Sequence, residues 1–387
     1  MSARLVLAVD GGNSKTDLAL LREDGSLLAH VRGGLSSPHH LGLPGSVELL
    51  QGMFDAALEQ AGLSVDGDPP AQVGRLLLAG LDFPAEEREL LGAVAPRGWA
   101  RSIAVANDTF AVLRAGTERG WGVAVVCGAG INCVGVGPDG RHVRFPALGS
   151  ISGDWGGGFD VGLAALSAAA RGEDGRGPRT VLERVVPEHF GVESPSRLGE
   201  AIHLGSIPLR RLVELPPVVF AAAATDAVAA AIVDRLAAEV AVLAQVALRR
   251  LELTSQPVDV VLGGGLFRQA DARLIAAVYA GLCGAGDAIS VRVTTAPPIV
   301  GAALLALDDL GAGAAAQERA RSELAAAAAG ERETRAKPAS SRTGCPASHS
   351  ERGPDDPRRG RSPVKPDRMS GIHSERGPDE PRSNIHG

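Results

Sequence analysis

The chain has 387 residues, of which 45% are hydrophobic and only 3% aromatic, and its formal net charge is −6. This length allows two or three domains with a sizeable core, while the charge of residues 1–330, with 27 basic and 36 acidic side chains, argues against nucleic-acid binding. No uncharged apolar run reaches about 20 residues and the first strand-like segment starts at Arg4, so the sequence predicts neither a membrane span nor a signal peptide.

Residues 4–115 begin with three short strands and continue with helices and strands in alternation. The expected strands are 4–9, 17–21, 27–31, 74–79 and 101–105, and the expected helices are 46–61, 84–94 and 108–115. An antiparallel meander followed by such alternation indicates an α/β domain with a mixed sheet.

The same scheme starts again at Trp121. Here the expected strands are 122–127, 131–136, 142–145, 258–262 and 289–293, and the expected helices include 226–251, 267–282 and 299–310. Because strand, glycine turn and strand open both halves, the sequence predicts a duplicated architecture with a cleft between the halves.

Residues 331–387 differ in composition from the rest of the chain. They contain eight prolines, no aromatic residue and eight residues of the hydrophobic set, too few to offset chain entropy, so a disordered tail is predicted. The segment 349–358 returns almost unchanged at 373–382. This repeat fits a solvated extension, with a partner-docking repeat as the alternative.

A glycine turn between the first two strands can hold phosphate: Asp10, Gly11, Gly12, Asn13, Ser14, Lys15 and Thr16. Glycines let backbone N–H groups approach an anion, the two hydroxyls add donors and the lysine adds charge. Lys15 is the only lysine before residue 337. Asp10 is suitably placed for Mg²⁺. The alternative is an ordinary hairpin turn.

Two further glycine clusters extend this pattern. Gly128, Ala129 and Gly130 lie between two strands, and Gly263, Gly264 and Gly265 follow a buried strand and precede a helix. Three such loops together predict a nucleotide lying across a two-domain cleft.

Asp108 follows a strand and opens a helix, next to Asn107. As an N-cap it would have a purely structural role. Strand ends of α/β sheets face ligand crevices, however, and a carboxylate there can accept a hydroxyl proton during phosphoryl transfer.

Gly153 and Asp154 open another glycine cluster, in which the aspartate either binds a sugar hydroxyl or caps the next helix. His39 and His40 are expected in a loop, on the surface or against substrate, because further metal ligands at a suitable spacing are missing. Cys127 and Cys133 are expected in the core, and four scattered cysteines without a C-x-x-C favour the cytoplasm.

In this order, the loops, Asp108 and the Gly153–Asp154 cluster resemble the actin-like (ribonuclease H-like) ATPase fold, and within it the BadF/BadG/BcrA/BcrD ATPase family and its N-acetylglucosamine kinase branch. The resemblance spans about residues 4–310. It implies an N-terminal domain at 1–116 and a C-terminal domain at 117–312. A terminal helix at 313–330 and the tail at 331–387 are expected to follow.

The resemblance also implies the site residues. Asp108 would be the general base, Asp10 would hold Mg²⁺, and the three glycine loops would bind the phosphates and adenosine of ATP. The sugar would contact Ser37, His39, Gly80, Asp82, Asn107, Gly153 and Asp154. The chain departs from the family pattern at Ala129, at Pro38 and at Leu148-Gly149, where a hydroxyl residue, an asparagine and Trp-Gly are usual.

The expected activity is ATP-dependent phosphorylation of an amino sugar, such as N-acetylglucosamine at its 6-hydroxyl. One alternative is an ATPase activator of a 2-hydroxyacyl-CoA dehydratase, which needs cysteine thiolates for an iron–sulfur cluster between subunits. Another is a non-catalytic sugar-sensing regulator, for which no N-terminal DNA-binding segment is apparent. A homodimer is compatible with the sequence.

Overall fold

The computed structural model describes residues 4–64, 67–269, 272–286 and 288–336. The predicted tail lies outside the described residues from 337 onward. Its first six residues, 331–336, instead continue the last helix, α12 (Ala314–Ala336), which is therefore longer than the predicted 313–330. None of the described helices combines the length and apolar character that crossing a membrane requires.

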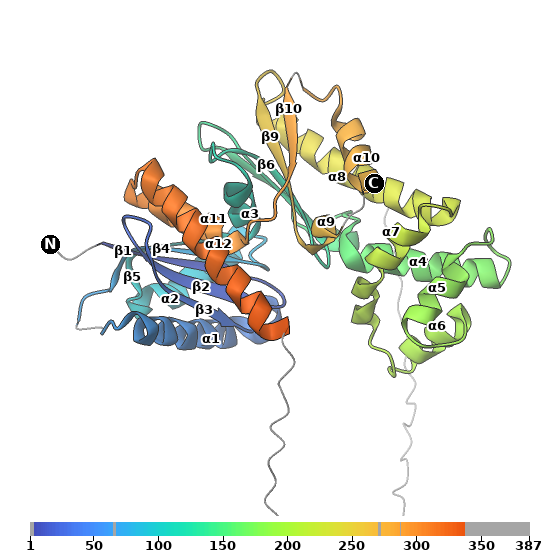
Figure 1. Cartoon of the computed structure of the whole chain (residues 1–387), viewed down its shortest axis with the longest axis horizontal. Helices are drawn as coiled ribbons and strands as arrows, with labels where there is room; N and C mark the ends of the chain where they lie inside the picture. The colour runs from blue at the N-terminus through green and yellow to red at the C-terminus, as the bar shows by residue number, and fades with distance from the viewer. Residues whose placement is uncertain (1–3, 65–66, 270–271, 287, 337–387) are drawn as a thin grey trace, which may run out of the picture. The chain divides into compact units, whose positions relative to one another are not determined.

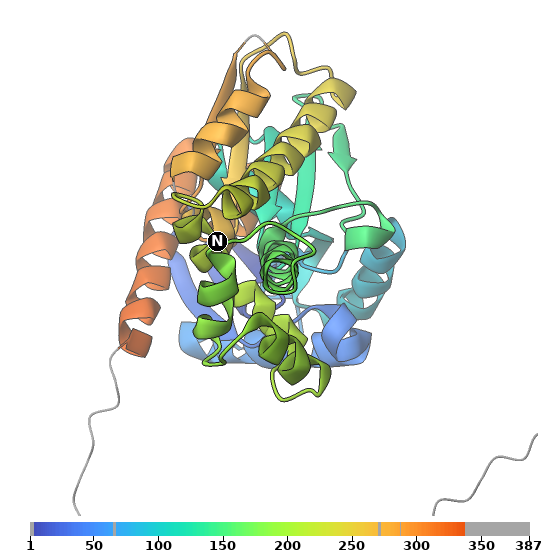
Figure 2. The same cartoon turned by 90° about the vertical axis from the view of Figure 1, so that its right-hand side faces the viewer.

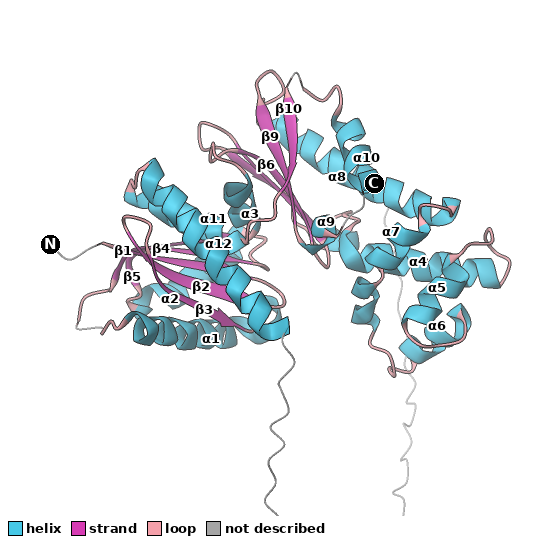
Figure 3. Cartoon of the chain, in the orientation of Figure 1, coloured by secondary structure: helices cyan, strands magenta, loops and turns pink. Residues whose placement is uncertain are grey.

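The first sheet contains five strands in the order β3-β2-β1-β4-β5 (Figure 3). They are β1 (Leu5–Gly11), β2 (Thr16–Arg22), β3 (Leu27–Gly33), β4 (Ala71–Leu78) and β5 (Ala100–Asn107). Strands β1, β2 and β3 pair antiparallel, whereas β1, β4 and β5 pair parallel. The predicted meander and mixed sheet are confirmed.

One face of this sheet packs against α1 (Pro38–Ala61) and α2 (Pro84–Val94), with the fully buried Trp99 in the same core. Helix α1 starts eight residues before the predicted Ser46. Its first turn is separated from the rest by a kink at Gly42, whose φ of 69° is non-helical, with Pro44 just after it. Because glycine and proline disfavour helix interiors, the sequence there is typical of a loop.

The opposite face of the first sheet packs against α11 (Pro298–Leu310) and α12, which come from the end of the described chain (Figures 1 and 2). The apolar side of α11 meets Val6 and Ala8 of β1 in a continuous core. The C-terminal domain predicted over residues 117–312 includes α11. Its packing instead joins it to the first sheet, so the chain returns to the first half before it ends.

The second sheet repeats the first in the order β10-β9-β6-β7-β8. Its strands are β6 (Gly122–Cys127), β7 (Ile131–Val136), β8 (His142–Arg144), β9 (Val258–Gly263) and β10 (Ile289–Val293). Again three strands pair antiparallel and three pair parallel. The predicted duplication is confirmed, and Cys127 and Cys133 are core residues as expected.

The helices of the second half share one large core with this sheet. They are α4 (Gly157–Glu173), α5 (Leu182–His189), α6 (Pro195–His203), α7 (Pro216–Ala222), α8 (Ala227–Arg250), α9 (Gly265–Arg268) and α10 (Ala272–Leu282). The single helix expected over 267–282 was wrong, because α9 ends at Arg268 and α10 begins after the undescribed residues 270–271. Between β5 and β6, α3 (Thr109–Gly116) contacts both sheets.

Candidate active site

Three parallel strands of the first sheet end in register at one edge. Gly11 of β1 lies opposite Leu78 of β4, which lies opposite Asn107 of β5. Such an edge is where ligands bind in α/β sheets. The strand ends therefore bring Asp10, Asp82 and Asp108 into one electrostatic environment, in which the charge of Asp108 acts on Asp10 and that of Asp82 acts on Asp108.

Asn107 organises this edge. Its side chain is almost completely buried, and its Nδ2 donates to Asp82 Oδ1 at 3.0 Å. Its Oδ1 accepts hydrogen bonds from the Thr109 backbone N–H at 3.0 Å and the Thr109 hydroxyl at 2.7 Å. Asn107 thus ties the Asp82 segment to the start of α3 and directs the chain through Asp108.

Asp108 occupies the N-cap position of α3, but its carboxylate makes no capping hydrogen bond. The start of the helix is anchored by Asn107 instead, so the capping explanation for this aspartate is wrong. Burial, together with the negative charge of Asp82, raises the pKa of Asp108 to about 7. A carboxyl with such a pKa is poised to exchange a proton near neutral pH.

Asp10 has the environment expected of a cation ligand. It is 8% exposed, and burial, with the charges of Asp108 and Asp17, raises its pKa to about 8. A nearby divalent cation would favour the ionised form, and carboxylate oxygens are the ligands that Mg²⁺ prefers. The residues present therefore fit a magnesium ion held by Asp10.

The structure brings together three of the predicted sugar residues. Gly80 has φ +80°, and a Cβ there would lie 2.7 Å from Ser37 Oγ and 3.2 Å from His39 Cγ. The Ser37 hydroxyl is buried and has no hydrogen-bond partner among the described residues, so it is available to a ligand. His39 lies in the first turn of α1 rather than in a loop.

Glu86 of α2 was not identified from the sequence, although it orders this segment. Its Oε2 accepts the backbone N–H groups of Asp82 and Phe83 at 2.7 and 2.8 Å, and its Oε1 lies 2.9 Å from His39 Nε2. The three groups His39, Asp82 and Glu86 are close enough to share a metal ion. These hydrogen bonds already satisfy Glu86, however, so we assign it to holding the loop. A glutamate three residues into a helix is the available sequence signal.

The first glycine loop closes tightly between β1 and β2, with Gly12 N–H donating to the Lys15 carbonyl at 2.9 Å. Asn13 and Ser14 are exposed at its tip. The Thr16 hydroxyl is buried and donates to the Gly34 carbonyl, so it is engaged within the protein and not presented as a phosphate donor. Lys15 Nζ lies 2.6 Å from Asp17 Oδ2.

The second and third glycine loops lie side by side. A Cβ on Gly264 would lie 2.2 Å from the carbonyl oxygen of Cys127, directly before Gly128. The start of α4 closes over the second loop, where Gly158 N–H and Phe159 N–H donate to the carbonyls of Gly128 and Ala129. Ala129 remains exposed.

Asp154 does not cap α4. Its Oδ2 accepts from the Ser152 hydroxyl within its own loop, while Asp160 Oδ2 accepts the Gly156 N–H at the start of the helix. Within the described part of the chain, no hydrogen bond or ion pair joins Gly153 or Asp154 to Asp82 or Asp108. Their role in sugar binding stays a prediction.

Two polar side chains of the second half, Arg144 and Asn132, contact the first half beside this edge. Arg144 of β8 donates to Glu87 of α2 and to the carbonyl of Leu81, next to Asp82. Asn132 Nδ2 lies 3.4 Å from Asn107 Oδ1. Because these partners are 25 to 63 residues apart in the chain, local sequence patterns gave no signal for them.

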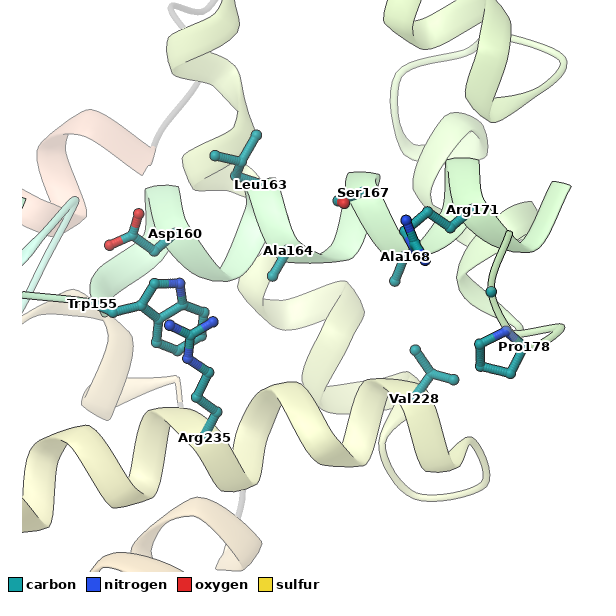
Figure 4. A pocket seen from close by; sticks show the side chains of 11 residues that line it. Trp155, Asp160, Leu163, Ala164, Ser167, Ala168, Arg171, Pro178, Val228 and Arg235 are labelled. Atoms are coloured by element: carbon teal, nitrogen blue, oxygen red, sulfur yellow. The ribbon is translucent and has the colours of Figure 1, made fainter. Parts of the chain in front are cut away.

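A pocket of about 420 Å³ lies between α4 and α8 (Figure 4). At one end the Arg235 guanidinium lies over the Trp155 ring, 3.9 Å from its centroid. The lining residues are Trp155, Asp160, Leu163, Ala164, Ser167, Ala168, Arg171, Gly177, Pro178, Val228 and Arg235. None of them is a predicted site residue, so we do not assign this pocket to the reaction.

Two curated sugar kinases are similar to this chain in sequence. The chain is 27% identical over 264 residues to an N-acetylmuramic acid/N-acetylglucosamine kinase from Clostridium acetobutylicum, covering 68% of this chain and 85% of that one. It is 24% identical over 202 residues to an N-acetyl-D-glucosamine kinase from Dictyostelium discoideum, covering 49% and 61%.

A solved structure of a putative N-acetylglucosamine kinase from Chromobacterium violaceum is similar with a TM-score of 0.61 and 25% identity, over 79% of this chain and all of that one. This likeness confirms the predicted fold of actin-like sugar kinases. The model of one family matches residues 7–306, most of the described chain. The chain therefore belongs to the BadF/BadG/BcrA/BcrD ATPase family.

Proposed function

We propose that this protein is an ATP-dependent kinase that phosphorylates an amino sugar, with N-acetylglucosamine at its 6-hydroxyl as the first candidate. The observation that carries the proposal is Asp108, a carboxyl with a pKa of about 7 at the ligand-binding edge of the sheet that makes no capping bond. The kinase names of the two curated relatives support the amino-sugar class.

In this proposal Asp108 accepts the proton of the attacking sugar hydroxyl. Asp82, the Ser37 hydroxyl and His39 would orient that sugar, which is supported by their proximity and by the unpartnered state of the hydroxyl among the described residues. Asn107 fixes the orientation of Asp82 relative to Asp108. Gly153 and Asp154 would approach the sugar from the second half of the chain.

Backbone N–H groups of the three glycine loops would hold the nucleotide, with Lys15 adding positive charge near the phosphates. Asp10 would hold Mg²⁺, which when bound neutralises charge on the phosphates. The chain's own contribution is to position the reacting groups and to stabilise charge. Free, buried thiols favour a reducing compartment, and we propose the cytoplasm.

The alternative of a dehydratase activator is not favoured by the environment of Cys127 and Cys133. Cys127 and Cys133 lie in the core, and burial raises the pKa of both thiols, which disfavours the thiolates that an iron–sulfur cluster requires. Bound iron in the purified protein would reverse this assignment.

The function is tested by a coupled ADP-release assay with ATP, Mg²⁺ and one sugar at a time. Glucosamine, N-acetylglucosamine, N-acetylmannosamine, N-acetylmuramic acid and glucose separate the amine, acetyl, C2 configuration and lactyl group. We expect the fastest release with N-acetylglucosamine or N-acetylmuramic acid. ADP release that no sugar accelerates would contradict the proposal.

A further inference from the structure

A buried carboxylate beneath the first glycine loop gathers three basic side chains. Asp17 of β2 is completely buried, and its Oδ2 lies 2.6 Å from Lys15 Nζ. Its Oδ1 lies 2.7 Å from Arg32 Nε and 3.2 Å from His30 Nε2. Burial acts to raise the pKa of Asp17, but hydrogen bonds from His30, Arg32 and Lys15 outweigh it and hold the pKa well below its usual range.

The sheet fixes this carboxylate close to Asp10. Asp10 pairs with Asp17 across β1 and β2, and Asp17 pairs with Arg32 across β2 and β3. Directly paired residues project from the same face of a sheet, so the three side chains form a row. Asp17 is thus the buried middle residue of this row, between Arg32 and the residue proposed to hold Mg²⁺.

Among the partners of Asp17, Lys15 is the accessible one. Its side chain is 44% exposed, compared with 13% for Arg32 and 4% for His30. An ammonium group has three donors, so one hydrogen bond to Asp17 leaves two for a ligand. Arg32 and His30 remain in contact with the Asp17 carboxylate while Lys15 binds a ligand.

We propose that Asp17 is a positioning residue for nucleotide binding, which holds the Lys15 ammonium at the first glycine loop so that its remaining donors can meet the phosphates. A lysine side chain loses conformational entropy when it is fixed in one rotamer. Because Asp17 fixes Lys15 before the nucleotide binds, this entropy loss does not weaken nucleotide binding. This inference rests on the nucleotide site of the proposed function, and it does not depend on which sugar is phosphorylated.

The sign of one substitution separates positioning from simple charge. Asp17→Asn removes a negative charge near the phosphates, so long-range electrostatics alone would strengthen the binding of ADP. Loss of positioning would weaken it instead. We expect Asp17→Asn to weaken ADP binding about tenfold, as measured by calorimetry without sugar, and tighter or unchanged binding would overturn the inference.

A double-mutant cycle tests whether Asp17 acts through Lys15. Lys15→Met should weaken ADP binding at least as much as Asp17→Asn, and the double variant should bind no more weakly than Lys15→Met alone. Fold damage caused by Asp17→Asn would appear in both backgrounds, so additive losses would overturn the inference. A wild-type chain that does not bind ADP would also overturn it.

Two further variants protect the test against misfolding. Asp17→Glu retains the charge that compensates Arg32 but displaces the carboxylate, so it should weaken ADP binding only when Lys15 is present. Lys15→Arg should restore part of the affinity lost in Lys15→Met, provided that Asp17 is intact. Because every measurement uses ADP alone, a chain with the expected coupling but no sugar-dependent turnover would contradict the proposed function and leave this inference standing.

Discussion

Asp108→Asn is the most direct test of the proposed chemistry. The amide has nearly the size of the carboxylate but cannot accept the hydroxyl proton at neutral pH. We expect sugar-dependent turnover to fall by roughly 10²–10⁴-fold, the usual contribution of a general base. At ~1.36 kcal/mol per factor of ten, this corresponds to about 2.7–5.4 kcal/mol of activation free energy.

The structure also predicts what this substitution leaves unchanged. Asp108 makes no capping hydrogen bond, and Asn107 anchors α3 in its place. Losing a genuine cap costs about 1 kcal/mol. We therefore expect no loss of melting temperature in Asp108→Asn. Because the carboxyl of Asp108 has its pKa raised by burial, a neutral amide can even raise the melting temperature slightly.

Asp226→Asn provides a matched control with the opposite expected result. Asp226 caps α8, where Oδ1 accepts the Ala229 N–H at 2.8 Å and Oδ2 accepts the Val181 N–H at 2.7 Å. One of these bonds is lost when an oxygen becomes an NH₂ group, so Asp226→Asn should lower the melting temperature and preserve turnover. Sugar-dependent ADP release, ADP affinity and thermal unfolding are measured on both variants.

The result that would refute the reasoning is specific. If Asp108→Asn retains turnover within about threefold of wild type, a difference of only ~0.7 kcal/mol, Asp108 is not the base. If turnover and ADP affinity fall together with the melting temperature, the residue is structural. Either result would remove the observation on which the kinase proposal depends.

Four other predictions follow from the packing and the charges. Asn107→Ala should reduce sugar-dependent turnover more than ADP affinity in kinetic and calorimetric assays, because Asp82 loses its hydrogen bond. Gly264→Ala should weaken ADP binding in calorimetry, since its Cβ would lie 2.2 Å from a backbone oxygen at φ +99°. Leu324→Ala, in a fully buried position against the first sheet, should cost roughly 2–5 kcal/mol in urea unfolding. Without ligands, the melting temperature should fall between pH 5 and pH 8. Folding raises the pKa of Asp10 to about 8, so the folded state binds more protons than the unfolded state in that range. A melting temperature that does not change with pH would contradict this prediction.

The strands and glycine loops were predictable because their signals are local. β6, β7 and β10 begin and end where the sequence predicts, since each is a short apolar run between turn residues. The order of the loops along the chain also identified the family. Neighbouring parallel strands of similar length place their carboxyl ends together. Because Asp10 and Asp108 lie at two such ends, the sequence could predict that they belong to one site.

The parts that could not be predicted depend on distant partners. Helix α11 is apolar enough to pack on either sheet, and only the fold shows that it covers β1. The first turn of α1 forms despite Gly42 and Pro44 because His39 contacts Gly80 and Glu86, which come from another part of the chain. Tertiary contacts there outweigh local propensity.

Asn107 illustrates how a structural neighbour can free a reactive group. The carboxylate of an aspartate at the N-cap position normally accepts hydrogen bonds from the helix N–H groups. These bonds favour the ionised form and lower the pKa of the aspartate. Here the preceding asparagine supplies the anchoring oxygen, and the same side chain holds Asp82 through its amide nitrogen. Asp108 itself is half-buried, and desolvation together with the negative charge of Asp82 raises the pKa of its carboxyl. Asn107 thus anchors the segment that carries the proposed base, while burial and the charge of Asp82 raise the pKa of that base.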